Sequence, residues 1–483
     1  HHLFFADLAL REEGVAELLP TTHVVVFDEA HQLPEVGTLF LSRSASTRQL
    51  VDLARDLAAA GLGEAPDGAD WTGLAAALER AARELRLQWP AGPPRRPAHE
   101  LARVGEFGAA LQALCTACAQ AASALQANAE RGALLARCAE RAAGLNETLR
   151  GWHAGSEPAA PQSGTGAAVD DSDEQIRWAE AHARAVSLYR TPLSIADAFS
   201  RHRDGPPRAW IFVSATLALD RDFSHFTGAL GLGEAHCLRW DSPFDFERNA
   251  LLYVPDALGE PGSDAFTQRL VEAAWPLVLA NHGRAFVLCT SLRAVRVAAQ
   301  RLRELCHAEP APITVLEQGE RPRTALLQRF RDLPGAVLVG SASFWEGVDI
   351  VGERLSLVVI DKLPFAAPND PVMSARIEAH SRRGKSAFEA LQLPMAAISL
   401  KQGSGRLIRS ETDRGLLMIG DERLLRKAYG RRLVRSLPPF PLTRDARHAL
   451  DFIAPRNPRK PGAVGAAPSA TPPTSAGRRA PAR

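Results

Sequence analysis

Long apolar runs, a large net charge and a cysteine framework are all missing from this sequence. No stretch of about 18 apolar residues offers a transmembrane helix, so we expect no membrane partner. The opening HHLFFADLAL lacks a basic leader and a small-residue cleavage site, which excludes a convincing signal peptide and makes the cytoplasm the expected location. With 483 residues, 46% hydrophobic and 23% charged, the chain is too long for one core and predicts two to four globular domains.

The small net charge of +2 excludes a uniformly basic nucleic-acid-binding protein. Residues 456–483 hold six basic residues and no acid, and removing those six from the total of 57 leaves 51 basic against 55 acidic residues. A DNA-binding surface must therefore be a local groove. The tail itself is rich in Pro, Ala, Gly and Arg without apolar periodicity, so we expect it to be disordered.

Six cysteines in a chain of this length do not suggest a disulfide framework. Cys115 and Cys118 form a C-x-x-C pair with Cys138 downstream, a spacing that could serve a metal or an iron-sulfur cluster. Their setting is an alanine-rich helical pattern, in which cysteine behaves as a small apolar residue. Core packing is the favoured interpretation, and a metal site is the alternative.

Strand-like and helix-like segments alternate through much of the chain, which predicts an α/β fold with a doubly wound parallel sheet. Residues from about 39 to 195 differ, because helical spacing dominates there and loop-like breaks fall at 89–100 and 155–174. Strand-like runs occupy 208–219, 283–292, 311–318, 335–350 and 355–365.

Two acids follow an apolar run in HVVVFDEAH, where Asp28 and Glu29 end a predicted buried parallel strand. Ligands bind at the carboxyl ends of such strands. A carboxylate there can hold Mg²⁺ through water, and its neighbour can activate the attacking water in phosphoryl transfer. A solvated acidic turn is the alternative, but it does not explain paired acids after an apolar strand.

Three further motifs carry polar groups suited to a nucleotide. Ser214 and Thr216 follow the strand WIFV, although alone they could simply cap a helix. In KQGSGRLIR, Arg406 and Arg409 are three positions apart, which predicts one helical face presenting two guanidiniums to a phosphate, with a surface ion-pair face as the alternative. In the motif FWEGVD, the glycine allows the backbone to approach a ligand closely, and the two acids could contact that ligand. For Phe344 in this motif, a place in the hydrophobic core is an equal alternative.

The order DEAH, SAT, EGVD, QGSGRLIR resembles motifs II, III, V and VI of superfamily two helicases. The phrases SATL, DSPFDF, FWEGVDIVG, DKLPFAAPNDP and QGSGRLIRSETDRG resemble the DinG/XPD-like branch, including YoaA-type enzymes, over nearly the whole chain apart from the tail. Asp28 and Ser214 lie 186 positions apart, too far for one ordinary strand connection, so an insertion is expected between them.

The resemblance implies two RecA-like motor domains, the first one incomplete, with a helical arch insertion. We expect the first domain at 1–38 and 196–235, the arch at 39–195, the second motor domain at 236–455 and the tail at 456–483.

The resemblance also implies roles for individual residues in ATP and Mg²⁺ use. Glu29, Arg406 and Arg409 would be catalytic, and Asp28 would place Mg²⁺ through water. The remaining implied residues are the nucleotide-site group His31, Glu346, Gly347, Asp349 and Gln402, the coupling pair Ser214 and Thr216, and the DNA-contacting pair Thr290 and Ser291.

A Walker A loop, G-x-x-x-x-G-K-[ST], does not precede Asp28. Gly384-Lys385-Ser386 has Ala379 in place of the first glycine and follows no predicted strand, so we interpret it as a chance match. In the family this loop and, in most members, four cysteines that bind a 4Fe-4S cluster lie upstream of the HHLF phrase. We therefore expect an N-terminally truncated chain that hydrolyses ATP poorly alone, with the cluster in the intact parent.

The leading hypothesis is an ATP-dependent DNA helicase that translocates on single-stranded or forked DNA, with 5′ to 3′ polarity and a repair or replication role implied by the family. The alternative is a non-catalytic nucleic-acid-binding or regulatory module. A helicase relative fused to an exonuclease domain is a third possibility.

Overall fold

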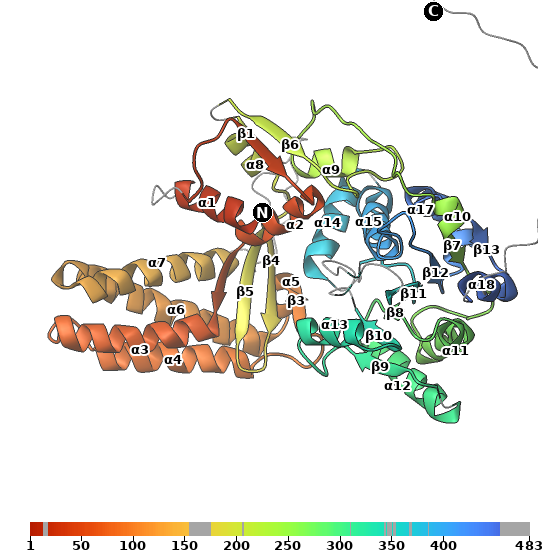
Figure 1. The fold of residues 1–483 in the computed structure, drawn as a ribbon. Coiled ribbons are helices and arrows are strands. Elements are labelled where there is room, and N and C mark those ends of the chain that lie inside the picture. Colours follow the sequence, from red (N-terminus) through yellow and green to blue (C-terminus); the bar gives the residue numbers. More distant parts are fainter. Residues whose placement is uncertain are drawn as a thin grey trace, which may run out of the picture.

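Three separate β-sheets organise the computed structural model, which describes residues 1–12, 18–153, 175–204, 207–309, 311–341, 344, 350, 354–366, 370–384 and 386–454 (Figure 1). One sheet has two strands, one has four and one has seven. The tail at 456–483, which was predicted to be disordered, lies outside the described residues.

The two-stranded sheet pairs segments that are far apart in sequence. β1 (Val24–Phe27) runs parallel to β6 (Ala209–Phe212), with Phe27 opposite Phe212. One face packs on an aromatic-rich core with α1 (His2–Glu12), α2 (Leu33–Phe40), α8 (Ala196–Arg203) and α9 (Ser224–Ala229).

The prediction that β1 is fully buried is wrong on one face. Val24 is 52% exposed and Val26 is 58% exposed, while Phe27 is buried. Side chains alternate between the faces of a strand, so an unbroken apolar run places half of its residues on whichever face has no covering element. In the described residues, that face of the β1–β6 pair is exposed.

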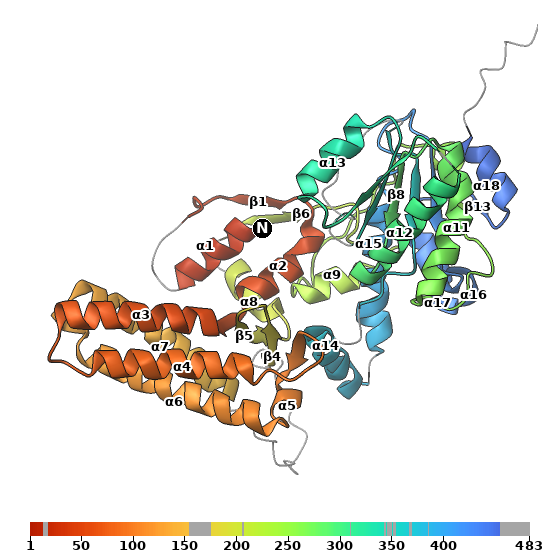
Figure 2. The same cartoon turned by 90° about the horizontal axis from the view of Figure 1, so that it is seen from below.

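Four long helices form a unit that projects from the rest of the molecule (Figure 2). They are α3 (Thr47–Glu64), α4 (Trp71–Leu87), α6 (Gly105–Ala127) and α7 (Ala133–His153). Their leucines and alanines share one core, which also holds Cys115, Cys118 and Cys138. Ser46 starts α3 with a capping box completed by Gln49, which satisfies two otherwise unpaired backbone groups.

Helix α6 is long and apolar enough to cross a membrane by length and composition. The search for unbroken apolar runs missed it because polar residues such as Gln112 and Gln120 interrupt the run. Nine of its residues, including Phe107 and Leu114, are buried in the helical core. A mostly buried core helix meets the same criteria, so this is weak evidence for a membrane segment.

An antiparallel sheet of order β2-β5-β4-β3 lies at the base of the helical unit, in the stretch where helices were expected to dominate. The strands are β2 (Arg43–Ser46), β3 (Arg95–Pro97), β4 (Gln175–Ala181) and β5 (Val186–Pro192). Trp178 and Tyr189 stack across β4 and β5 with ring centroids 4.2 Å apart. The break at 89–100 therefore contains a strand, whereas the whole break at 155–174 lies outside the described residues.

The seven-stranded sheet is parallel throughout, with order β13-β7-β12-β11-β8-β10-β9. Four expected runs supply β8 (Ala285–Leu288), β9 (Thr314–Glu317), β10 (Ala336–Gly340) and β11 (Leu357–Ile360). The strands that the sequence analysis missed are β7 (Ala250–Tyr253), β12 (Gly415–Ile419) and β13 (Leu442–Thr443).

Both faces of this sheet are covered, as expected for a doubly wound fold. The helices on one face are α11 (Asp264–Ala280), α12 (Leu292–Ala308) and α18 (Ala446–Ile453). Those on the other are α13 (Arg323–Asp332), α15 (Leu393–Ser404) and α17 (Ala428–Ser436). The remaining helices are α5 (Ala98–Leu101), α10 (Phe246–Asn249), α14 (Pro371–Arg382) and α16 (Arg423–Arg426).

Two glycines of α3 provide a matched test of packing in the helical unit. A Cβ at Gly61 would overlap the buried ring of Trp71, whereas nothing lies within 4 Å of a Cβ at Gly63. We expect Gly61→Ala to lower the free energy of unfolding by about 1–3 kcal/mol through overpacking. Gly63→Ala should raise it by up to ~1 kcal/mol through helix propensity. Urea unfolding of both variants measures the difference, and equal effects would contradict this packing.

Candidate active site at the ends of two parallel strands

The acid pair lies directly after β1, at the carboxyl edge of the two-stranded sheet. The N–H of Ala30 donates to the carbonyl of Val213 over 3.0 Å, which fixes the turn against β6. Glu29 adopts a left-handed backbone with φ 49°, a conformation unusual for a residue with a side chain. Asp28 and Glu29 are both exposed to solvent, so their carboxylates are accessible to a ligand.

The serine of the SAT motif lies beside this acid pair, because β6 runs parallel to β1. The hydroxyl of Ser214 donates to Glu29 Oε2 over 3.0 Å. It also lies 3.1 Å from the hydroxyl of Thr216 and accepts from the Thr216 N–H over 3.2 Å. The structure thus joins two motifs that are 186 positions apart in the sequence.

His31 extends these contacts toward the seven-stranded sheet. Its Nδ1 lies 2.9 Å from Ser214 Oγ, and its Nε2 lies 2.7 Å from the side-chain nitrogen of Gln402 on α15. An amide nitrogen can only donate, so Nε2 must accept and Nδ1 must carry the proton. The hydrogen bonds then run in one direction, from Gln402 through His31 and Ser214 to Glu29.

Lys401, which the sequence analysis overlooked, makes a second contact beside this series of hydrogen bonds. Its Nζ donates to the carbonyl of Ala218, two residues after the SAT motif, over 2.9 Å. Burial, assisted by the charge of Arg239, lowers the pKa of Lys401 to about 8. Two successive residues of α15 therefore contact the two strand-end motifs of the other sheet.

Arg406 and Arg409 do not lie on a helical face, so that part of the prediction is wrong. Helix α15 ends at Ser404, with Gly405 as its C-cap, and both arginines follow in a turn and an irregular segment. Glycine is the residue most often found where helices end, and the segment after it no longer has helical spacing. Arg406 is four positions after Gln402, and both arginine side chains are partly buried.

The other sequence motifs divide between the core and segments outside the described residues. Phe344 is 1% exposed and belongs to the core of the seven-stranded sheet. Glu346, Gly347 and Asp349 lie outside the described residues, as does Lys385. Gly384 follows the end of α14, which is not the strand-to-helix setting of a phosphate loop.

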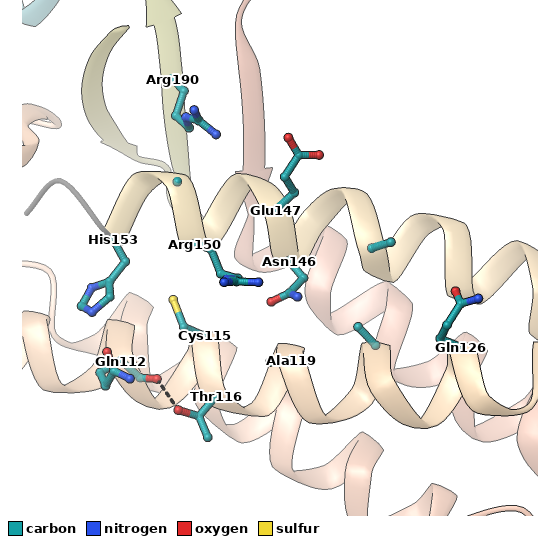
Figure 3. Close-up of a pocket in the computed structure, with 13 residues that line it drawn as sticks. Gln112, Cys115, Thr116, Ala119, Gln126, Asn146, Glu147, Arg150, His153 and Arg190 are labelled. Atoms are coloured by element: carbon teal, nitrogen blue, oxygen red, sulfur yellow. Dashed lines mark hydrogen bonds between the residues drawn. The ribbon is translucent and has the colours of Figure 1, made fainter. Parts of the chain in front are cut away.

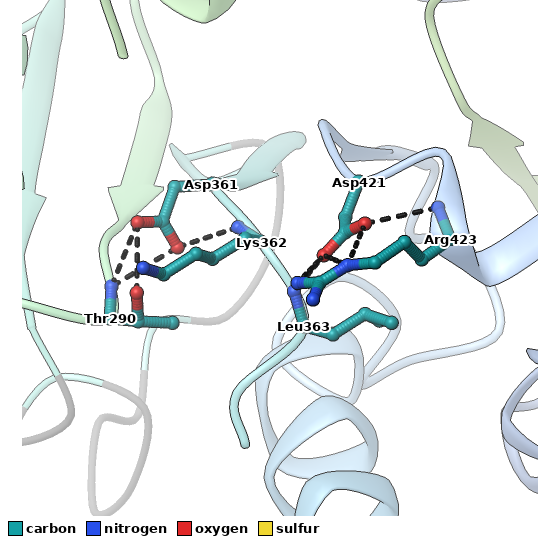
Figure 4. Close-up of polar contacts among 6 residues, drawn as sticks. All are labelled: Thr290, Asp361, Lys362, Leu363, Asp421 and Arg423. Atoms are coloured by element: carbon teal, nitrogen blue, oxygen red, sulfur yellow. Dashed lines mark hydrogen bonds and ion pairs between the residues drawn. The ribbon is translucent and has the colours of Figure 1, made fainter. Parts of the chain in front are cut away.

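Thr290 and Ser291 occupy the turn between β8 and α12 at the carboxyl edge of the seven-stranded sheet. Ser291 caps α12 by accepting the Ala294 N–H over 3.2 Å. The N–H and the hydroxyl of Thr290 both donate to the carboxylate of Asp361, each over 3.1 Å (Figure 4). This buried acid, which the sequence analysis did not select, also accepts the Lys362 N–H. Burial raises the pKa of Asp361 to about 6, although these hydrogen bonds oppose the increase.

A second buried acid stabilises the adjacent strand end (Figure 4). Asp421, which follows β12, accepts hydrogen bonds from two side-chain nitrogens of Arg423, over 2.9 and 2.6 Å. It also accepts a hydrogen bond from the N–H of Leu363 over 3.0 Å. The hydrogen bond to Asp421 raises the pKa of Arg423. The run GLLMIGDE, in which acids follow apolar residues, is the sequence signal that could have identified this site.

The residues present fit Mg²⁺ but not an iron-sulfur cluster. The exposed oxygens of Asp28 and Glu29 are the ligand type that Mg²⁺ prefers. By contrast, Cys115 and Cys118 are packed among the leucines and alanines of the helical core, where burial raises the pKa of both thiols. Within the described residues, no group of three or more His, Cys, Asp or Glu could hold a metal.

Comparisons with known proteins agree with this geometry. A family model described as a helicase C-terminal domain matches residues 275–440. The chain is 39% identical over 454 residues to the ATP-dependent DNA helicase YoaA of Escherichia coli, covering 94% of this chain and 68% of that protein. It is 38% identical over 269 residues to the ATP-dependent helicase DinG of Mycobacterium tuberculosis, covering 55% of this chain and 39% of that protein.

Solved structures of XPD proteins share the fold at low sequence identity. An apo XPD structure superposes with a TM-score of 0.54 and 14% identity, covering 92% of this chain and 80% of that chain. At this identity the likeness supports the α/β fold with parallel sheets.

Proposed function

Because this chain belongs to the YoaA/DinG family of XPD-like ATP-dependent DNA helicases, we propose that it is part of an ATP-driven motor that translocates on single-stranded DNA and unwinds duplex or forked DNA. The observation that carries this proposal is the hydrogen-bond chain from Gln402 through His31 and Ser214 to Glu29. These hydrogen bonds link Glu29, which would activate water, to α15 on the seven-stranded sheet, which would move during translocation.

Each residue around this series of hydrogen bonds has a separate role in ATP hydrolysis. Asp28 would hold Mg²⁺ through water, and the bound ion would neutralise phosphate charge. Glu29 orients the attacking water and accepts its proton, while Ser214 holds the Glu29 carboxylate in place. Arg406 and Arg409 approach from the other sheet and stabilise negative charge that develops on the transferred phosphoryl group.

Coupling to DNA movement uses the same contacts. A change in the position of Glu29 during hydrolysis alters the hydrogen bond at Ser214, and His31 transmits that change to Gln402. We propose further that the four-helix unit with its basal sheet is the arch domain, that translocation runs 5′ to 3′, and that the protein acts on the chromosome, and so in the cytoplasm, during repair or replication.

Strand separation by the full-length gene product tests the proposed function. We expect ATP hydrolysis stimulated by single-stranded DNA and ATP-dependent release of a labelled strand from a forked duplex. A protein that binds DNA but neither hydrolyses ATP nor separates strands would instead support a non-catalytic nucleic-acid-binding module.

The contact between Thr290 and Asp361 predicts a pH dependence of DNA binding. Above pH 6 the ionised Asp361 accepts two hydrogen bonds from Thr290, the proposed contact to the DNA backbone. Since its pKa is about 6, lowering the pH through 6 protonates the acid and loosens Thr290. We expect binding of single-stranded DNA to weaken roughly fivefold, equivalent to one hydrogen bond of ~1 kcal/mol.

Fluorescence anisotropy of wild type and Asp361→Asn between pH 5 and 7.5 measures this effect. Asp361→Asn should bind DNA weakly across this whole pH range, because asparagine resembles the protonated acid. Asp332→Asn, at an exposed acid on α13, controls for the charge change. Parallel pH profiles for all three proteins would contradict the assignment.

A further inference from the structure

An arginine row crosses the antiparallel sheet at the base of the four-helix unit. Arg190 on β5 is directly opposite Arg43 on β2 and directly opposite Arg177 on β4. Directly opposed residues project from the same face, so three guanidiniums lie side by side across three strands. Like charges in this arrangement destabilise a sheet.

Acids compensate this row at one end only. Arg43 pairs with Glu147 of α7. Among the described residues Arg190 has no ion pair, and Arg177 donates only to the carbonyl of Trp152. Burial and then the charge of Arg190 lower the pKa of Arg177. The next strand differs, because Arg95 on β3 is opposite Glu180 and pairs with it.

A groove between α6 and α7 opens beside this row, with a volume of about 840 Å³. Asn146, Arg150 and His153 extend into it from α7, Gln112 and Thr116 face them from α6, and Arg190 reaches over from β5 (Figure 3). Gly151 leaves room for Arg190, since a Cβ at that position would overlap its guanidinium.

Polar atoms at the groove lack partners within the protein. Nε of Arg190, Nδ1 of His153 and Oδ1 of Asn146 are buried and have no hydrogen-bond partner among the described residues. Buried polar groups without a partner are costly. An anion could accept from Nε of Arg190, whereas Oδ1 of Asn146 is itself an acceptor and needs a donor such as water. The lining holds the guanidiniums of Arg150 and Arg190 and one carboxylate, Glu147. Because Glu147 pairs with Arg43, the remaining positive charge favours an anion.

The groove runs along the helices rather than forming a closed pocket. Its lining spans Gln112 to Gln126 on α6, roughly 20 Å at 1.5 Å per residue. An extended polyanion fits this shape better than a single phosphate. Its lining contains no Phe, Tyr or Trp, so it offers contacts to a phosphate backbone and no stacking surface for bases.

We propose that this α6–α7 groove, with Arg150 and Arg190, binds the phosphodiester backbone of single-stranded DNA at a site separate from the motor. The proposal rests on the proposed function for the identity of the polyanion. It gives the four-helix unit a direct role in guiding the strand.

The test compares binding of fluorescein-labelled oligothymidylate to the 483-residue chain and to Arg150→Ala/Arg190→Ala over a series of salt concentrations. Loss of two phosphate contacts should weaken binding roughly tenfold near 0.1 M salt and reduce the slope of log K against log salt by about 1.4. Arg150→Lys/Arg190→Lys should retain most of the affinity, because lysine still contacts phosphate as a point charge.

A charge-matched control is Arg80→Ala/Arg103→Ala, which removes two exposed arginines of the same unit outside the groove. It should bind as wild type does. Arg190→Ala should not lower the melting temperature, since it removes opposed like charges, so weak binding cannot be attributed to misfolding. Cross-linking with 4-thiothymidine should label peptides from 105–127 or 133–153.

Two outcomes overturn the proposal and are distinguishable. Unchanged affinity and salt slope in Arg150→Ala/Arg190→Ala, with binding by wild type intact, would exclude DNA from the groove and favour an acidic protein partner. No binding of oligothymidylate by wild type would contradict the proposed function as well.

Discussion

Glu29→Gln should reduce the turnover of DNA-stimulated ATP hydrolysis by ~10²- to 10⁴-fold, the contribution typical of a positioned general base. Glutamine keeps the length of the side chain and can still accept the hydrogen bond from Ser214, so the SAT motif should stay in place. Affinity for single-stranded DNA should change little. The measurement is steady-state phosphate release by the full-length gene product at saturating ATP and DNA.

Glu35→Gln is the matched control, because it removes the same charge from an exposed position six residues away on α2. It should hydrolyse ATP at nearly the wild-type rate. Turnover of Glu29→Gln within a factor of about three of wild type would remove this residue from the chemistry, since general bases contribute far more.

Arg406→Ala should lower ATP turnover by ~10³-fold or more, as expected for an arginine that stabilises transition-state charge. This corresponds to about 4 kcal/mol of activation free energy. Arg409→Ala should have an effect of the same kind. Because both residues follow the end of α15 close to Gln402, their effects should appear in the rate of hydrolysis rather than in DNA affinity.

Arg426→Ala controls for the loss of an exposed guanidinium, since Arg426 is 69% exposed and paired with Glu422 on the surface of the same sheet domain. Surface pairs of this kind contribute little, so its ATPase rate should be unchanged. A near-normal rate in Arg406→Ala would assign this arginine to structure instead of catalysis.

The sequence was most informative at the ends of strands. The pattern of apolar residues followed by acids selected Asp28 and Glu29 as candidates, and hydroxyl residues after a second apolar run selected Ser214. Parallel pairing of β1 with β6 places both groups at one sheet edge. That pairing depends on β-branched and aromatic residues whose pattern is visible in the sequence.

The pairing of strands that lie far apart in the chain was harder to predict from the sequence. β2 and β3 consist of the polar segments RSAS and RRP, which have no apolar alternation, and they pair with strands more than 80 positions away. Tertiary context decides such strands, because β propensity is weak. The exposure of Val24 and Val26 likewise depends on which elements cover the strand.

Several site residues could be found only from the structure. Lys401 reads as an ordinary surface lysine until its Nζ is placed against Ala218, and Asp361 requires the adjacency of β8 and β11. The error over Arg406 and Arg409 came from extending α15 past Gly405. The arginine row depends on strand register, which the sequence alone does not give.

The most direct test of the account is a structure of the full-length gene product with Mg²⁺, ADP-aluminium fluoride and single-stranded DNA. We predict that the fluoride, which stands for the transferred phosphoryl group, is contacted by Arg406 or Arg409 and faces a water held by Glu29, with His31 and Gln402 still in contact. A nucleotide bound elsewhere, or arginines directed away from Asp28 and Glu29, would contradict it.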